Sequence, residues 1–253
     1  MLPVFVALVC GLLVGSFLNV CIYRLPRKES VVWPGSRCGA CGRSLQWFEN
    51  VPVVSWLVLG ARCRTCHARI SATYPVVEGV TGLIFAGGYL VYGFHPLLLV
   101  RLTFACMVVV LFVIDLRHRI LPDRITLPGI VIGLGASAVL PPGPASALAG
   151  ILLGGGLLWA ISEGYLRLRG REGLGFGDVK MLAMIGAFLG WQLTLLTLFL
   201  ASLAGSVVGV WLLASRKGGL QSALPFGTFL AIGALVSAVV GDQVVAWYVG
   251  LYR

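Results

Sequence analysis

Four cysteines stand in two closely spaced pairs near the start of the chain. They are Cys38, Cys41, Cys63 and Cys66, a CxxC pattern that occurs twice with 21 residues between the pairs. Each pair can place two thiolates on one tight turn, and two such turns complete the tetrahedral four-sulfur geometry that zinc prefers. A closed site of this kind leaves no coordination position open for a substrate. The spacing therefore predicts a structural Zn²⁺ site, and we expect the neighbouring His67 to be an ordinary surface residue.

Three aspartates are the other candidates for chemistry among only nine acidic residues. Asp115 ends a long apolar stretch, Asp123 follows a proline, and Asp178 follows the run Gly-Phe-Gly. Asp123 and Asp178 could each cap the start of a helix, where an anion complements the helix dipole. Asp115 fits capping poorly, because an anion at the end of a helix opposes that dipole. The residues alone leave two interpretations open, a functional pair of Asp115 and Asp178 or separate helix caps.

A functional pair of carboxylates would support acid–base chemistry. Two carboxylates that lie close together cannot both be ionised cheaply, so they share a proton. The ionised partner can draw a proton from water, while the protonated partner donates a hydrogen bond to a carbonyl oxygen. Gly175 and Gly177 would let an extended peptide backbone approach Asp178, since glycine lacks a Cβ. The sequence cannot say which aspartate would be the base.

The elements that must position these residues are membrane helices. Only 11% of the 253 residues are charged and the mean hydropathy is +0.97, whereas a soluble domain carries about 25% charged residues. A membrane-spanning helix needs ~20 mostly apolar residues. Eight such windows are found, and the sixth is short: roughly 2–23, 75–92, 95–115, 125–141, 145–166, 178–190, 193–214 and 225–250. The prediction is an all-α polytopic membrane protein of about eight transmembrane helices with a small cytoplasmic zinc-ribbon-like insert.

The expected domains follow from the change in polarity along the chain. Residues 1–23 form the first transmembrane helix, residues 24–74 form the polar four-cysteine insert, and residues 75–253 form a multi-helix membrane domain. The insert is too short to build a large apolar core, so a bound metal would replace part of that core.

Basic residues concentrate on one side of this topology. Seventeen of the nineteen Lys and Arg fall in residues 24–69, 117–124, 167–180 and 216–217. This bias marks the cytoplasmic side and places both termini outside the cytoplasm. It also accounts for the net charge of +10 without nucleic acid, which we do not expect as a partner. Asp115 and Asp178 are then both expected at the cytoplasmic membrane face, 63 positions apart in the sequence.

Several longer motifs together resemble the type IV prepilin peptidases, a family of GxGD aspartic peptidases. These motifs are GSFLNVCIYRLP (Gly15–Pro26), the two CxxC pairs, FENVPVVSWLVLGARCRTC (Phe48–Cys66), ISATYPVVE (Ile70–Glu78), DLRHRILPD (Asp115–Asp123) and GLGFGDVK (Gly173–Lys180). The resemblance covers nearly the whole chain. In that family the catalytic aspartates stand at the positions of Asp115 and Asp178.

The resemblance implies a bifunctional enzyme of the bacterial inner membrane. Such an enzyme cuts the leader peptide from type IV prepilins or pseudopilins at the cytoplasmic membrane face, and it serves type IV pilus or type II secretion assembly. It then methylates the new N-terminal residue with S-adenosylmethionine. The methyl donor rests on the resemblance alone, because no dinucleotide-binding fingerprint is present. The expected partners are prepilin substrates and the lipid bilayer, and the sequence leaves the oligomeric state open.

Two other functions compete with the peptidase. An ion or proton transporter would place paired acids near the middle of the bilayer, whereas this pair is expected at one face. A membrane-anchored zinc module for protein binding would leave Asp115 and the GFGD run unexplained.

Overall fold

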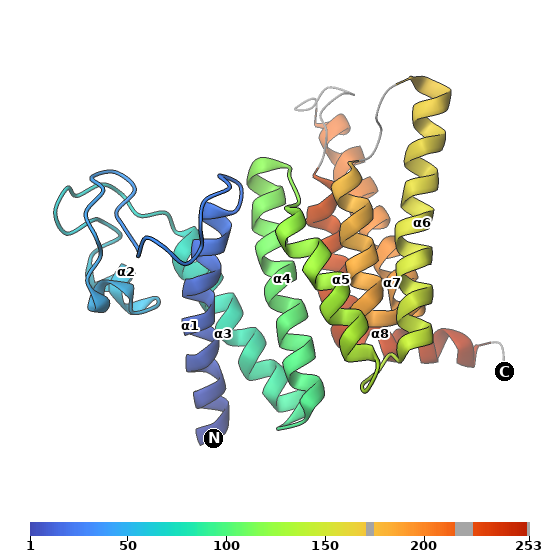
Figure 1. Ribbon diagram of the computed structural model, residues 1–253, viewed down its shortest axis with the longest axis horizontal. Helices are drawn as coiled ribbons and strands as arrows, with labels where there is room; N and C mark the ends of the chain where they lie inside the picture. Colours follow the sequence, from blue (N-terminus) through green and yellow to red (C-terminus); the bar gives the residue numbers. More distant parts are fainter. Residues whose placement is uncertain (171–174, 216–224, 252–253) are drawn as a thin grey trace. The chain divides into compact units, whose positions relative to one another are not determined.

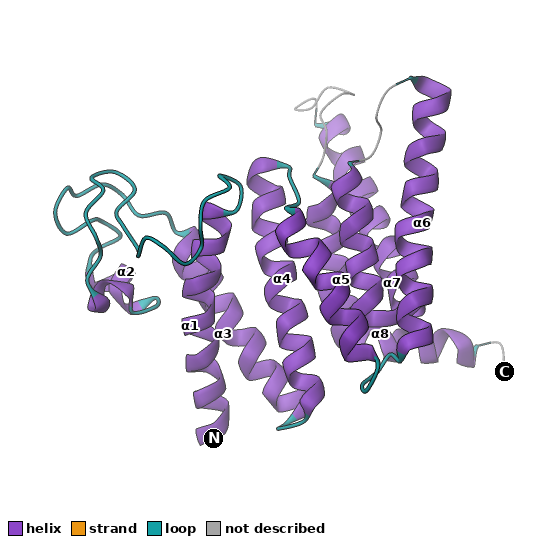
Figure 2. Ribbon diagram, in the orientation of Figure 1, coloured by secondary structure: helices purple, strands orange, loops and turns teal. Residues whose placement is uncertain are grey.

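The computed structural model describes residues 1–170, 175–215 and 225–251, and its long elements in these ranges are all helices, while most of the insert is loop (Figure 2). Within them the only β-type pairings are two isolated bridges, Arg37 with Ser44 and Arg62 with Arg69. Five residues used in the topology and motif arguments lie outside the described ranges: Arg171, Gly173, Leu174, Arg216 and Lys217. The expected all-α class is confirmed.

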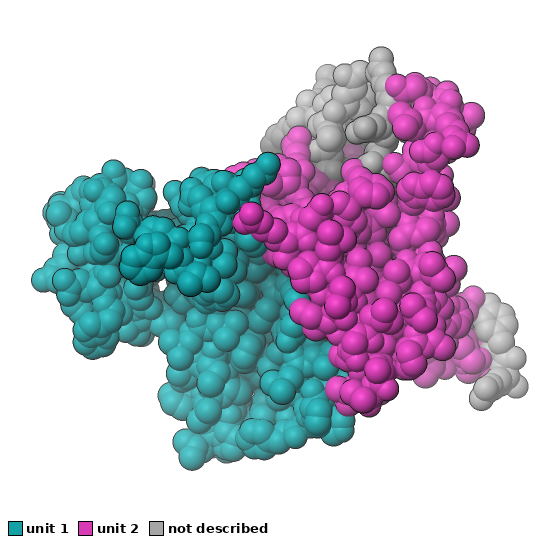
Figure 3. Space-filling view, viewed as in Figure 1, with its two compact units in different colours: residues 1–110 teal, residues 111–253 magenta. Residues whose placement is uncertain are grey.

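The chain forms two compact units, Met1–Val110 and Leu111–Arg253 (Figure 3). The boundary falls inside helix α4 (Pro96–His118), so this helix contributes to both units. The boundary between the units, after Val110, differs from the expected domain boundaries at residues 23 and 74. Those expected boundaries concern membrane topology and stay a prediction.

The first unit consists of α1 (Leu2–Arg24), the insert, α3 (Thr73–Tyr92) and the first part of α4 (Figure 1). The insert contains the 3-10 helix η1 (Trp47–Asn50) and the short helix α2 (Val54–Val58). Helices α1 and α3 pack closely at Gly15, where an added Cβ would lie 2.7 Å from the Cα of Glu78. Small residues at such a crossing allow membrane helices to approach each other.

The second unit consists of the last turns of α4, α5 (Asp123–Ser137), α6 (Pro144–Arg169), α7 (Phe176–Ala214) and α8 (Phe226–Gly250). Helix α7 is central to its core, since Met181, Leu182, Met184 and Ile185 are completely buried. Close packing of α6 against α7 again uses glycine, because a Cβ at Gly154 would lie 2.9 Å from the carbonyl oxygen of Leu182. The core therefore holds the start of α7 firmly in place.

Six helices in the described ranges are long and apolar enough to cross a membrane: α1, α3, α4, α6, α7 and α8. Each of the eight expected windows is helical. Two features explain why eight expected windows correspond to six long helices in the described ranges. Helix α5 has only 15 residues, fewer than the ~20 that span a bilayer. Helix α7 covers both the sixth and the seventh window, so the protein is a multi-pass membrane protein with one short helix and one double-length helix.

Helix α7 is broken at Gly190, at the boundary expected between those two windows. Its dihedral angles are φ 78° and ψ 173°, a combination that in practice only glycine adopts. The residue is also tightly surrounded, since an added Cβ would lie 2.9 Å from the Cβ of Pro142. The sixth window is therefore short because the helix axis changes at a glycine.

Candidate active site and metal site

Asp115 lies in the last turn of α4 and is almost completely buried, with 5% of its surface exposed. One of its carboxylate oxygens, Oδ2, accepts two hydrogen bonds from Thr228. The backbone N–H of Thr228 donates at 2.6 Å and the hydroxyl of Thr228 donates at 2.9 Å. Asp115 is thus bound by a residue that follows it by 113 positions in the sequence.

The start of α8 explains why an anion is tolerated at the end of α4. Helix α8 begins at Phe226, so the N–H of Thr228 is one of the first four, which have no partner within the helix. The positive end of the α8 dipole also favours a carboxylate at this place. Glycine leaves room beside it, because a Cβ at Gly227 would lie only 3.0 Å from Oδ2 of Asp115. The start of α8 therefore compensates the unfavourable position of the Asp115 carboxylate at the end of α4.

Asp178 lies in the first turn of α7 and is partly exposed. Its backbone N–H donates to the carbonyl oxygen of Gly175 at 3.0 Å. The two glycines of the motif differ in what they permit. A Cβ at Gly177 would lie 3.0 Å from the Cβ of Leu121, whereas one at Gly175 would lie 3.4 Å from the carboxylate of Asp178, an ordinary contact. Gly177 therefore allows the loop after α4 to pack against the start of α7.

Asp115 and Asp178 line the same cavity, which has a volume of about 300 Å³. The cavity belongs entirely to the second unit, and the two carboxylates are close enough for the charge of Asp115 to act on Asp178. The other lining residues come from the loop after α4, the first residue of α5 and the start of α7: Arg119, Ile120, Leu121, Asp123, Gly175 and Gly177. The space has room for a water molecule and for part of a peptide. Two carboxylates around it can carry out acid–base chemistry on that water.

The third aspartate, Asp123, also lines this cavity and is paired with a lysine of α7. Lys180 donates to both carboxylate oxygens of Asp123, at 2.7 and 2.8 Å. The N-cap of α5 is Pro122, and Asp123 stands inside the first turn without a side-chain capping bond. Asp123 is therefore not the N-cap of α5 and its carboxylate binds across to α7, although its charge still stands in the first turn, where it complements the helix dipole. Arg119, with a left-handed φ of 54°, also lines the cavity.

The four cysteines form a cluster in the first unit. Each offers its sulfur atom, and all four Sγ atoms lie within 4.8 Å of one another, with those of Cys38 and Cys66 3.8 Å apart. Four sulfurs at ~2.3 Å from a tetrahedral zinc ion would be ~3.8 Å apart. The donor set and its spacing therefore fit a tetrahedral metal ion, with the Cys38–Cys66 distance already at the expected value.

The two cysteine turns have the same backbone design. The N–H of Gly42 donates to the carbonyl of Cys38, and the N–H of His67 donates to the carbonyl of Cys63, at 2.9 and 3.0 Å. Gly42 and His67 both have left-handed φ values, 71° and 55°. His67 is exposed and is not a member of the four-sulfur cluster, as expected. The two turns thus share one backbone hydrogen bond and one left-handed position, which glycine occupies in the first turn and histidine in the second.

Backbone N–H groups favour the thiolate form at the first cysteine of each turn. Those of Cys66 and Thr65 lower the pKa of Cys63 to about 6, and those of Cys41 and Ala40 lower the pKa of Cys38. Thiolates are the form that binds metal.

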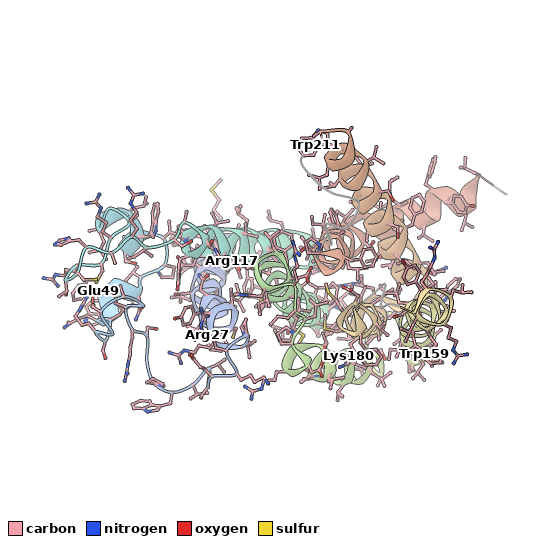
Figure 4. All side chains as sticks on the ribbon, turned by 90° about the horizontal axis from the view of Figure 1, so that it is seen from above. Arg27, Glu49, Arg117, Trp159, Lys180 and Trp211 are labelled. Atoms are coloured by element: carbon pink, nitrogen blue, oxygen red, sulfur yellow. The ribbon has the colours of Figure 1, made fainter. Side chains whose placement is uncertain are left out.

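An ion pair stabilises the segment between the two cysteine turns. Arg43 donates to Glu49 at 2.6 Å, and the backbone N–H of Gln46 donates to the other oxygen of Glu49 at 2.8 Å. Both interactions, the Arg43 hydrogen bond first, hold the pKa of the buried Glu49 below its ordinary value. Figure 4 shows Glu49 within the insert, among side chains that do not belong to the long helices. Glu49 is thus a structural acid of the insert.

Thr228 and Lys180 are the residues that sequence reasoning did not single out for this site. Thr228 carries no charge and stands in an ordinary helix start, so a search for carboxylates and metal ligands passes over it. Lys180 belongs to the GLGFGDVK run but offered no reason to expect a partner in α5.

Comparisons with known proteins match both units. Residues 9–92 match the Bacterial Peptidase A24 N-terminal domain, and residues 102–210 match the Type IV leader peptidase family. Proteins named prepilin leader peptidase/N-methyltransferase are similar over nearly the full length. The one from Pseudomonas putida is 38% identical over 95% of this chain and 91% of its own, and the one from Stutzerimonas stutzeri is 37% identical over 98% and 94%. The one from Pseudomonas aeruginosa is 36% identical over 94% and 90%. No solved structure matches the chain.

Proposed function

The chain belongs to the type IV leader peptidase family, and from this premise we propose that it is a bifunctional prepilin-processing enzyme. Its first activity is that of an aspartic endopeptidase, which cuts the leader peptide from type IV prepilins or pseudopilins. Its second activity transfers a methyl group to the new N-terminal residue. The substrates are identified by the names that the relatives carry.

The observation that carries the peptidase assignment is the cavity shared by Asp115 and Asp178. Both residues come from helix ends in the same unit, so the two carboxylates face one space from α4 and from α7. A transporter needs acids along a path through the bilayer, near its middle. A pair confined to helix termini at one end of the unit favours hydrolysis at a membrane face.

The hydrogen bonds of Asp115 suggest the roles of the two aspartates. Two hydrogen bonds from Thr228, one from its backbone N–H and one from its hydroxyl, stabilise a negative charge on Asp115. The carboxylate of Asp178 accepts no comparable pair of hydrogen bonds in the described ranges, and it faces the same cavity as Asp115. We therefore assign the ionised carboxylate to Asp115 and the shared proton to Asp178.

The reaction then follows from these two protonation states. Asp115 removes a proton from a water molecule in the cavity as the water oxygen attacks the scissile carbonyl carbon. Asp178 donates its proton to the carbonyl oxygen, which gives a neutral tetrahedral intermediate. As the C–N bond breaks, the intermediate returns one hydroxyl proton to Asp178, and Asp115 passes its proton to the leaving nitrogen. Both carboxyl groups end in their starting states.

The active site of this enzyme faces the cytoplasm from the inner membrane. The support is the distribution of basic residues, since the ends of α4 and α6 and the start of α7 carry Arg117, Arg167, Arg169 and Lys180. Asp115 and Asp178 lie at these same helix ends. A substrate whose leader lies in the cytoplasm and whose apolar segment lies in the bilayer would present its cleavage site at this level.

The insert binds one Zn²⁺ through Cys38, Cys41, Cys63 and Cys66. The ion would tie the two cysteine turns together and contribute folding free energy. Its role would be structural, since four thiolates leave no position for a substrate.

The methyl donor is S-adenosylmethionine, inferred from the N-methyltransferase in the relatives' names. The glycine-rich turn that follows a strand in nucleotide-binding α/β folds has no counterpart in the described residues. No residue is therefore assigned to the donor.

Mass spectrometry of a prepilin co-expressed with the enzyme tests both activities at once. The expected product lacks its leader and carries one additional methyl group at its N-terminus. The matched control is the same prepilin co-expressed with the Asp178→Asn variant, which should keep its leader. An intact prepilin beside the wild-type enzyme would refute the peptidase, and a cleaved but unmethylated one would refute the second activity.

A further inference from the structure

The insert carries an exposed apolar surface on η1 and α2. It consists of Trp47, Val54, Leu57 and Val58, whose exposed fractions are 81%, 55%, 63% and 80%. We call these four residues the η1–α2 surface. Apolar side chains gathered in this way in a polar segment mark a place where something else binds. The metal cluster does not use them, so the η1–α2 surface needs another explanation.

A hydrogen bond between the insert and α3 fixes the depth of this surface. The backbone N–H of Val53, which directly precedes α2, donates to Oε2 of Glu78 at 2.8 Å. Glu78 is five residues beyond the start of α3 at Thr73, which corresponds to ~7.5 Å along the helix axis. Figure 1 agrees, since it shows α2 beside the upper part of α1, at the lower edge of the insert. The η1–α2 surface therefore lies at the level of the spanning helices and not beyond their ends.

The insert is held at this depth by several contacts. Both of its ends join spanning helices, α1 at Arg24 and α3 at Thr73. The indole N–H of Trp56, within α2, donates to the carbonyl oxygen of Ile70 at 3.2 Å. Val53 itself has a left-handed φ of 61°, which is costly for a β-branched residue. The bond to the buried Glu78 holds this unfavourable conformation, so the position of α2 is imposed by the fold.

The charge of the insert indicates what covers the surface. Residues 24–74 contain eight basic and only two acidic residues, and one of the two, Glu49, is already paired with Arg43. The guanidinium of Arg64 lies 5.6 Å from the centre of the Phe48 ring, next to Trp47. Apolar and aromatic residues together with basic ones are typical of elements that lie in a membrane interface.

We propose that the η1–α2 surface inserts into the boundary between headgroups and acyl chains of the cytoplasmic leaflet, and that the basic residues of the insert contact anionic phospholipid headgroups. The insert is then an interfacial membrane element as well as a metal site. The bilayer would hold the insert against α1 and α3 and would cover apolar side chains that water otherwise contacts. This inference does not depend on the reaction that the enzyme catalyses.

The test measures the depth of Trp47 in the purified full-length protein. The protein is placed in nanodiscs of phosphatidylethanolamine and phosphatidylglycerol, with or without bromine on the acyl carbons near the headgroup. The difference between wild type and Trp47→Phe isolates the emission of Trp47. Brominated lipid should reduce it about twofold, while aqueous iodide should have little effect, as for a side chain buried 5–10 Å into the interface.

Trp33 provides the matched control for this measurement. It is exposed like Trp47, but its loop lies at the end of α1, where Arg24 donates to the carbonyl oxygens of Ser30 and Gly35. Its emission, isolated with Trp33→Phe, should respond more to iodide and less to bromine than that of Trp47. Equal responses of the two tryptophans, or access of iodide to Trp47, would overturn the proposal. Shielding of Trp47 that appears only when a prepilin peptide is added would overturn it in favour of a substrate-binding surface.

A substitution within the surface gives an independent result. Val58→Asp should weaken the quenching of Trp47 by brominated lipid, while Val32→Asp, at another exposed position of the insert, should not. The zinc content of both variants reports whether the insert is still folded. Unchanged quenching in Val58→Asp would contradict the proposal. Equal quenching in nanodiscs of phosphatidylcholine alone would contradict the part assigned to anionic lipid.

Discussion

The two clusters of ionisable side chains in this protein are built in opposite ways. The cysteine cluster is local, because each half comes from four consecutive residues and both turns repeat the same hydrogen bonds. The aspartate site is assembled from distant parts, since Asp115, Asp178 and Thr228 come from the ends of three different helices. A local motif reveals its partners in the sequence. In a site assembled from distant helices, the sequence points only to residues with an unusual charge, such as the two aspartates, and not to their partner Thr228.

The comparison also separates two functions of charge. In the cysteine cluster, backbone N–H groups favour thiolates, and a metal ion can then join them into a fold. At the aspartate site, the start of one helix stabilises a carboxylate at the end of another, and a neighbouring carboxylate must share its space. The first arrangement suits a cation, whereas the second suits the transfer of a proton.

The largest expected effect is the loss of cleavage when either aspartate is changed. Asp115→Asn and Asp178→Asn should each lower the rate of prepilin cleavage at least ~100-fold, because an amide can neither accept nor donate the transferred proton. Asp242→Asn is the matched control, since Asp242 is exposed and lies sixteen residues beyond the start of α8. Purified enzyme and a prepilin substrate measure all three rates. Wild-type cleavage by either of the first two variants would remove that aspartate from the site.

The second effect concerns the local cluster. Cys63→Ser removes one of four ligands and should weaken zinc binding at least ~10-fold, which elemental analysis of the purified protein detects. Cys10→Ser changes a cysteine of α1 outside the cluster and should leave the zinc content unchanged. Full zinc occupancy in Cys63→Ser would contradict the four-sulfur site.

The third effect tests whether the assembled site extends to Thr228. Thr228→Val removes the hydroxyl donor to Asp115 and keeps the backbone donor, so cleavage should fall about tenfold, as for one lost hydrogen bond to a charged group. Thr228→Ser keeps a hydroxyl and should restore most of the rate. Similar rates for the valine and serine variants would show that the hydroxyl has no role.

The smallest effect separates the two halves of the cysteine cluster. His67→Gly relieves a left-handed backbone and should stabilise the metal-bound insert by up to about 1 kcal/mol, whereas Gly42→Ala introduces the same cost on the other side. The rate at which a chelator removes zinc should fall in the first variant and rise in the second. Changes in the same direction would show that the two turns are not equivalent.

Much of this structure could be predicted from the sequence because its signals are local. Apolar windows give the helices, and CxxC pairs give the cluster. The join of the sixth and seventh windows into α7 was not predictable, since Gly190 changes the axis without a polar loop. The apolar windows therefore predicted the helical segments correctly, but they did not show that the sixth and seventh segments form one helix.

The aspartate site was only partly predictable, for a physical reason. Asp115 was conspicuous because its charge opposes the dipole of α4, but the group that compensates it lies 113 residues later, at the start of α8. Asp123 suited a helix cap equally well on local grounds. Its true partner, Lys180, follows from tertiary packing that places the start of α5 beside the start of α7.

The central claim is that Asp115 and Asp178 share one proton across one cavity, and infrared spectroscopy observes that proton directly. At neutral pH the wild-type enzyme should show an absorption band from a protonated carboxyl group that disappears in Asp178→Asn and remains in Asp123→Asn. A spectrum that Asp178→Asn leaves unchanged would mean that Asp178 carries no proton, and the proposed dyad would be contradicted.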